Sequence, residues 1–194
     1  MNKLKKLFAN LGMSMISQTV ILVLGFVIPR IIMQSYGSDT NGLTSTITQI
    51  FTYMALLEAG ISQATRNKLF KPIKEDNKEE ISYWMSVSRR YFRRISAVYF
   101  AIVLVLAVLL PLVLNTSVGY WTIAFYIFFE GLTSVVSFYF INTWVSFLNS
   151  KGDTYVVNAL TLLNKVLCYG VKIVLALFGF NIALIQVGYF LVSV

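Results

Sequence analysis

The chain has 194 residues, of which 57% are hydrophobic and 12% are charged. A soluble globular domain carries about 25% charged residues, so this composition excludes an ordinary water-soluble fold and indicates a membrane protein. The sequence has no histidine and a single cysteine, Cys168. These counts exclude a histidine-based catalytic relay, a disulfide framework and a cysteine metal site, so we expect no enzyme and no cofactor.

Apolar stretches follow one another along the whole chain. A helix needs about 20 apolar residues to cross the hydrocarbon core. Five stretches reach this length, and the sixth stops at Val194 after 14 residues. We therefore predict an all-α polytopic transmembrane bundle of about six spans in one domain, and we expect the chain to be the front part of a longer protein. The predicted spans are residues 11–33, 43–63, 95–114, 121–148, 155–180 and 181–194.

Basic residues are distributed unevenly among the segments that connect these spans. Lys3, Lys5 and Lys6 precede the first span and nine more lie in the connection 64–94, whereas 34–42 and 115–120 hold none. Connections rich in lysine and arginine stay in the cytoplasm, so we expect a multi-pass protein of the cytoplasmic membrane with a cytoplasmic amino terminus. We therefore expect the net charge of +8 to reflect contacts with membrane lipids and not with nucleic acid.

The end of the basic connection has the spacing of an amphipathic helix. Ile81, Trp84 and Tyr91 recur at helical intervals within residues 78–94, with arginines between them. This pattern is typical of a helix that lies on the inner leaflet with its arginines near anionic head groups. A solvated connecting helix has the same spacing, and periodicity does not separate the two.

Two of the charges within the spans lie toward the outer surface. Arg30 follows Leu11 by 19 residues and Lys172 follows Tyr155 by 17, which places each about 25–28 Å along its helix. Either side chain can reach the head groups by snorkelling, and either can line a polar cavity.

Two other charges are expected near the bilayer midplane. Glu130 lies nine residues after Trp121, and Lys165 lies ten residues after Tyr155, about 14–15 Å deep in each case. They either form an ion pair that holds two helices together or line a wet cavity.

The fifth span carries its polar residues on one helical face. Asn158, Thr161, Lys165 and Lys172 fall at spacings of three, four and seven. Such stripes also serve helix packing, but two lysines on one stripe favour a surface that accepts an anion. Glu58, in the second span, is a further candidate for the bundle interior.

Four short strings in the first 75 residues resemble the polysaccharide biosynthesis flippases of the multidrug/oligosaccharidyl-lipid/polysaccharide superfamily. They are residues 25–30 (GFVIPR), 36–43 (YGSDTNGL), 56–61 (LLEAGI) and 69–72 (LFKP). The resemblance implies the N-terminal lobe of a transporter that flips an anionic lipid-linked oligosaccharide by alternating access. A second lobe is then the partner, and Arg30 and Glu58 match family-like positions. Glu130, Lys165 and Lys172 complete the candidate substrate-binding set on the depth and stripe arguments alone.

Three other functions stay open on the sequence. A cation-coupled multidrug exporter of the same superfamily would favour acidic cavity residues, which lysines here match or outnumber. A membrane-embedded glycosyl or acyl transferase would place Asp or His at a membrane face, where the outer connections hold only Asp39, which suits a turn. A non-transporting remnant is the third, because the last apolar stretch is short.

Overall fold

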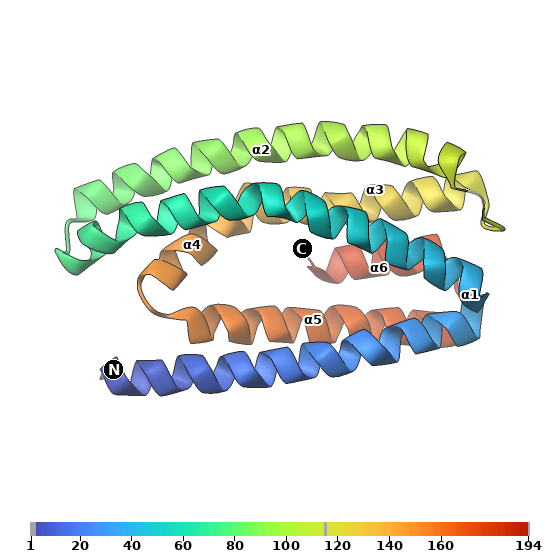
Figure 1. Ribbon diagram of the computed structural model, residues 1–194, viewed down its shortest axis with the longest axis horizontal. Helices are drawn as coiled ribbons and strands as arrows, with labels where there is room; N and C mark the ends of the chain where they lie inside the picture. Colours follow the sequence, from blue (N-terminus) through green and yellow to red (C-terminus); the bar gives the residue numbers. More distant parts are fainter. Residues whose placement is uncertain (1–2, 115, 194) are drawn as a thin grey trace.

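The computed structural model describes residues 3–114 and 116–193, and all the regular structure in these residues is helical (Figure 1). The expectation of an all-α chain is confirmed. Residue 115, in the expected connection 115–120, and residue 194 lie outside the described residues. In chain order the elements are α1 (Lys3–Lys74), α2 (Lys78–Val113), α3 (Tyr120–Val136), η1 (Ser137–Ile141), α4 (Asn142–Ser150), α5 (Thr154–Leu177) and α6 (Ile182–Ser193).

Four helical runs in the described residues are long and apolar enough to cross a membrane. These are α1, α2, the run Tyr120–Ser150 that joins α3, η1 and α4, and α5. The helix α6 is apolar but has only 12 residues, which give about 18 Å and not a full crossing. The chain therefore has the helices of a multi-pass membrane protein.

The helix α1 folds back on itself at Gly37, so that residues 3–36 and 38–74 form two arms that diverge from the turn, with α4, α5 and α6 between them (Figure 1). Gly37 has φ 86° and ψ 169°, a backbone conformation that is essentially restricted to glycine. The segment 34–42, expected as a connection, is helical apart from this residue. One glycine therefore performs the reversal for which the sequence pattern indicated a loop.

The basic connection 64–94 is a helical hairpin, which we call the basic hairpin. The second arm of α1 continues to Lys74, and α2 begins at Lys78, where Asn77 Oδ1 accepts a hydrogen bond from the Glu80 amide at 3.2 Å. From there α2 runs for 36 residues without a break, about 54 Å. The expected helix over 78–94 therefore does not lie separately on the inner leaflet, because it continues directly into the span.

The helices pack as two groups joined by α4 and α6. The second arm of α1 packs with α2 and α3, the first arm packs with α5, and α6 contacts both α3 and α5 (Figure 1). The core of the first group contains Ile47, Phe51, Tyr99, Val103 and Ile127. Gly131 of α3 allows the close approach of α2, since a Cβ there would lie 2.4 Å from Val103 Cγ2.

Candidate functional site

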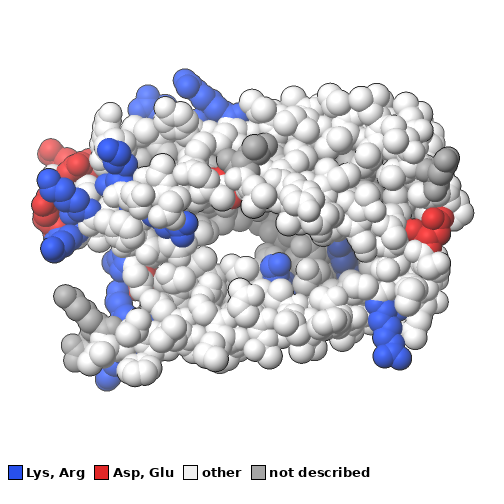
Figure 2. Space-filling model, in the orientation of Figure 1, with Lys and Arg blue, Asp and Glu red and all other residues white. Residues whose placement is uncertain are grey.

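A cavity of about 320 Å³, here called the central cavity, opens between both arms of α1 and the helices α3, α5 and α6. Figure 2 shows the molecule hollowed between the second arm of α1 and α5. The polar wall of the central cavity on the second arm of α1 includes Ser45, Thr48 and Gln49. The opposite wall carries charged and aromatic groups.

Lys172 of α5 lies in the central cavity against aromatic rings. Its ammonium nitrogen is 4.1 Å from the centroid of the Tyr189 ring and 5.8 Å from that of Tyr126. Within the described residues it makes no salt bridge. Cation–π contacts of this kind stabilise an ammonium group that has left bulk water, so Lys172 can remain charged inside the bundle.

Glu130 of α3 faces the same cavity and is held by α6. Its Oε2 accepts a hydrogen bond from Gln186 Nε2 at 2.5 Å, and the Gln186 side chain is fully buried. A buried amide that donates to a carboxylate fixes the position of that carboxylate. The central cavity therefore presents one cation and one anion, each oriented by a residue of α6.

The expected approach of Glu130 to Lys165 does not occur as an ion pair in the described structure. Lys165 instead lies 6.0 Å from the centroid of the Tyr169 ring on its own helix and is not part of the central cavity wall. The reason is the packing order. The backbones of α3 and α5 do not come close to each other, because α6 packs against both, and Gln186 of α6 occupies the place beside Glu130.

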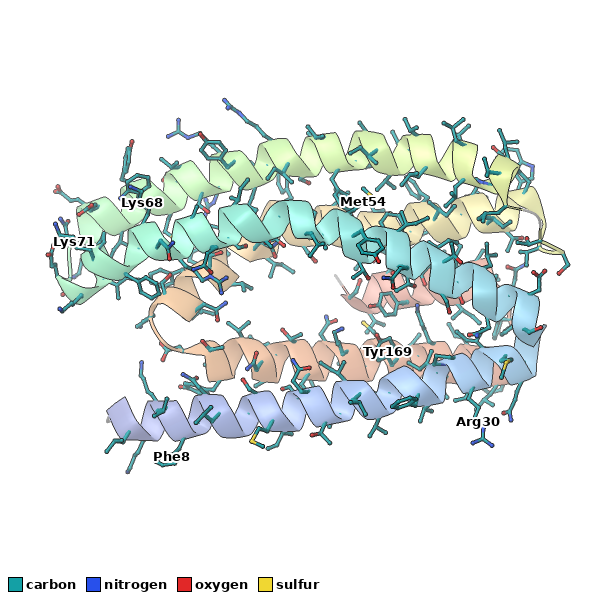
Figure 3. The ribbon with its side chains drawn as sticks, in the orientation of Figure 1. Phe8, Arg30, Met54, Lys68, Lys71 and Tyr169 are labelled. Carbon is teal, nitrogen blue, oxygen red and sulfur yellow. The ribbon has the colours of Figure 1, made fainter. Side chains whose placement is uncertain are left out.

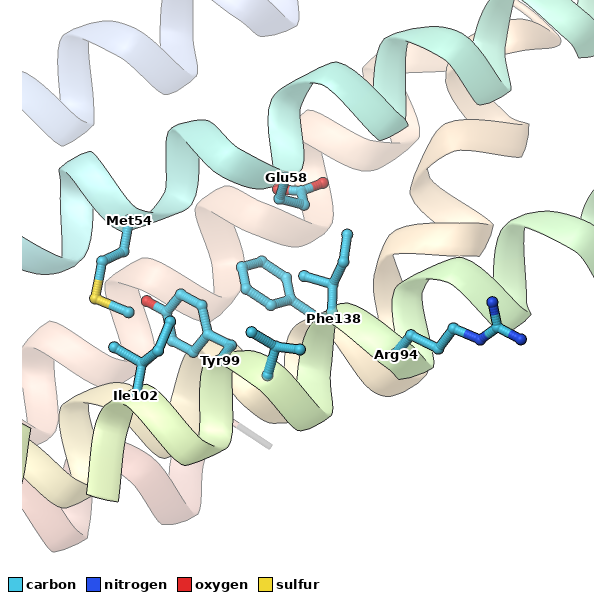
Figure 4. A pocket seen from close by; sticks show the side chains of 8 residues that line it. Met54, Glu58, Arg94, Tyr99, Ile102 and Phe138 are labelled. Atoms are coloured by element: carbon cyan, nitrogen blue, oxygen red, sulfur yellow. The ribbon is translucent and has the colours of Figure 1, made fainter. Parts of the chain in front are cut away.

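Arg30 and Glu58 also lie outside the central cavity. Arg30 is exposed and points away from the bundle (Figure 3), as a snorkelling side chain would. Glu58 lines a separate pocket between the second arm of α1, α2 and η1, together with Arg94 (Figure 4). Its carboxylate accepts a hydrogen bond from the Ser62 hydroxyl. Of the five candidate substrate-binding residues, the structure places two, Glu130 and Lys172, in the central cavity.

The polar stripe of α5 divides between two roles. Near the start of α5, Asn158 Nδ2 donates to Ser14 Oγ at 2.7 Å, which packs this end against the first arm of α1. About three to four turns later, Tyr169 and Lys172 face the central cavity, where Tyr169 is labelled in Figure 3. The same periodicity therefore serves helix packing at one end and the cavity at the other.

Sequence reasoning missed Tyr126, Tyr189 and Gln186. Each lies in an apolar stretch and attracts little notice as a single residue. A signal was present in the spacing: Tyr126 precedes Glu130 by four residues, and Gln186 precedes Tyr189 by three. Both intervals place the two side chains on one helical face.

No protein family model, curated protein or solved structure matches this chain. The described residues contain no cluster of side chains that could hold a metal ion. The central cavity offers an ammonium group, a carboxylate, three phenol rings and several hydroxyl and amide groups. These groups suit the binding of a charged, hydrogen-bonding molecule within the bundle.

Proposed function

We propose that this chain is the N-terminal lobe, of about six spans, of a transporter that moves a lipid-linked oligosaccharide across the cytoplasmic membrane by alternating access. The observation that carries the proposal is the central cavity, in which Lys172 lies among Tyr126, Tyr169 and Tyr189 inside an apolar helical bundle. The amino terminus and the basic hairpin are cytoplasmic in this proposal, as the distribution of lysine and arginine favours.

The cavity chemistry matches the two parts of such a substrate. A pyrophosphate group cannot enter hydrocarbon without cationic partners, and Lys172 supplies a charge that no carboxylate in the described structure neutralises by direct contact. Sugars need hydrogen-bonding groups on several sides. Ser45, Thr48 and Gln49 provide these on the wall opposite Lys172.

The chain by itself is proposed to bind the substrate but not to carry it across. Alternating access requires one lobe to move against another, and a second lobe supplies the other half of the substrate path. Transport of the substrate by liposomes that contain only this chain would contradict this part of the proposal.

Binding by the purified chain tests the proposal. A short-chain prenyl pyrophosphate disaccharide is compared with its uncharged prenyl analogue by native mass spectrometry in detergent. We expect the charged ligand to bind at least about tenfold more tightly, as a charge-assisted contact provides. Equal binding of both ligands would count against a site for pyrophosphate.

A second candidate, a cation-coupled multidrug exporter, is favoured by one observation. Glu130 and three tyrosine rings share the central cavity, and carboxylates and aromatic faces both attract organic cations. The two candidates differ in their response to charge removal. Tight binding of a lipophilic cation that is lost in Glu130→Gln and strengthened in Lys172→Gln would support the exporter and contradict the flippase.

A further inference from the structure

Three neighbouring depressions follow one another along α2, beside the second arm of α1, and we call them together the groove. The first, about 300 Å³, lies between Lys68 and Trp84 in the basic hairpin, and it shares Val87 and Tyr91 with the second, of about 230 Å³. The second shares Arg94 with the third, of about 220 Å³. None of the residues that line this groove lines the central cavity, so it is a separate feature.

The groove changes from basic to apolar along the axis of α2. Its middle is formed by Arg90, Arg94 and the exposed ring of Tyr91. Beyond Arg94 the wall consists largely of Ile95, Val98 and Ile102 (Figure 4). A groove with cations at one end and an open apolar channel next to them is complementary to an amphiphile, which has a charged head group and a hydrocarbon tail.

The position of the change matches the boundary of a bilayer. From Arg94 to Val113 the helix α2 rises over 19 residues, about 28 Å, and none of residues 95–113 is charged. This length equals the hydrocarbon thickness of a typical membrane. Arg90 and Arg94 therefore lie at the level of the head groups on the basic side of the protein, and Val98 and Ile102 lie among the acyl chains.

The four arginines of α2 form two pairs with different surroundings. Arg89 lies 5.7 Å from the centroid of the Trp144 ring, and Arg93 lies 5.0 Å from that of Tyr139, so this pair packs on the run from η1 to α4. Arg90 and Arg94, one helical turn apart on a different face, line the groove instead. Within the described residues Arg90 and Arg94 make neither a salt bridge nor a cation–π contact.

The groove also holds one acid, Glu58, whose carboxylate accepts a hydrogen bond from Ser62. Lys68, at the other end, lies 5.2 Å from the centroid of the Trp84 ring. Three cations against one anion leave the groove with a positive net charge. This balance favours an anionic head group over a zwitterionic one.

We propose that this groove binds an anionic phospholipid of the inner leaflet, with its phosphate between Arg90 and Arg94 and one acyl chain along Val98 and Ile102. The floor of the groove is preformed, because Thr65 Oγ1 and Ser88 Oγ form a buried hydrogen bond of 3.1 Å that ties α1 to α2. The proposal depends on the membrane placement of α2 and not on what the central cavity carries.

Native mass spectrometry of the full chain in detergent, with added phosphatidylglycerol, phosphatidylethanolamine or phosphatidylcholine, tests the proposal. We expect phosphatidylglycerol to give the most abundant lipid adduct. The double variant Arg90→Gln/Arg94→Gln should bind this lipid about 25-fold more weakly, since each arginine near a head group contributes about fivefold. The matched control, Arg89→Gln/Arg93→Gln, removes the same charge from the same helix and should bind phosphatidylglycerol within about twofold of the wild type.

A third variant, Val98→Trp, fills the apolar channel without a change of charge. It should lower the affinity for phosphatidylglycerol while leaving that for glycerol phosphate, which has no tail, unchanged. Thermal unfolding of each variant in detergent confirms that it is folded before binding is compared. Equal losses in the two arginine pairs, or equal binding of phosphatidylglycerol and phosphatidylcholine by the wild type, would overturn the proposal.

Discussion

The ammonium group of Lys172 lies 4.1 Å from the centroid of the Tyr189 ring, and this contact joins α5 to α6 inside the central cavity. Because α6 also holds Glu130 through Gln186, one short helix orients both charges of the cavity. The position of α6 therefore determines the electrostatics of the candidate site.

Removal of the Tyr189 ring should destabilise the bundle. We expect Tyr189→Leu to lower the free energy of unfolding by about 2 kcal/mol, since Lys172 loses a cation–π partner in a desolvated place. Tyr189→Phe keeps the ring and should change the stability by less than about 0.5 kcal/mol. The measurement is thermal unfolding in detergent. Equal losses in the two variants would show that the hydroxyl, and not the ring, is what matters.

Replacement of Gly37 tests the reversal of α1. A side chain at φ 86° and ψ 169° is strained, so Gly37→Ala should cost about 1–3 kcal/mol. The control is Gly12→Ala in the first arm, where the backbone is helical and no atom lies within 4 Å of an added Cβ. That change should be neutral or stabilising by up to about 1 kcal/mol. If both substitutions had the same effect on the unfolding temperature, the backbone of Gly37 would not be the constraint.

Much of the helical content follows from the sequence, because an uncharged apolar run such as residues 95–113 has one stable form in lipid. The depth of Glu130 within its span also predicts an interior position, because a charge at the midplane is costly. Lys172 is a cavity candidate from the polar stripe of its helix, with snorkelling as the open alternative. Their neighbours were not predicted. Gln186 lies beside Glu130 and Tyr189 beside Lys172 because α6 packs against both α3 and α5. The spacing of these residues predicts a shared helical face, but it does not predict which neighbouring helix that face meets.

The pH dependence of stability should include a contribution from Asp39. The hydroxyl and the backbone amide of Ser117 donate hydrogen bonds to its carboxylate, and they lower the pKa of Asp39 from its ordinary value of 3.8. A lowered pKa in the folded state means that the stabilisation is complete above the unfolded value and is lost as the pH falls through the folded one.

Asp39→Asn removes this titration. The difference in unfolding temperature between the wild type and Asp39→Asn should therefore be constant from about pH 7 to about pH 5 and shrink below about pH 4. Ser117→Ala removes the hydroxyl donor and keeps the amide donor. It should therefore reduce part of this pH-dependent difference in unfolding temperature. If the unfolding temperature of the wild type exceeded that of Asp39→Asn by the same amount at low pH, the lowered pKa of Asp39 would be contradicted.

Orientation is tested by cysteine labelling in a Cys168→Ala background. We expect Lys78→Cys, in the basic hairpin, to resist a membrane-impermeant thiol reagent in intact cells and to react after lysis. Ser38→Cys, beside the reversal of α1, should react in intact cells. The opposite pattern would invert the proposed topology, which rests on the positions of lysine and arginine.

Lys172 is proposed to recognise a pyrophosphate-linked sugar in the central cavity. The most direct test of this proposal is the dissociation constant of a short-chain prenyl pyrophosphate disaccharide for the wild type, Lys172→Gln and Lys172→Arg, with Arg30→Gln as a control that removes an exposed cation outside the cavity. We predict a loss of at least about tenfold for Lys172→Gln, a smaller loss for Lys172→Arg and less than about twofold for Arg30→Gln. Unchanged affinity in a folded Lys172→Gln protein would contradict the proposal.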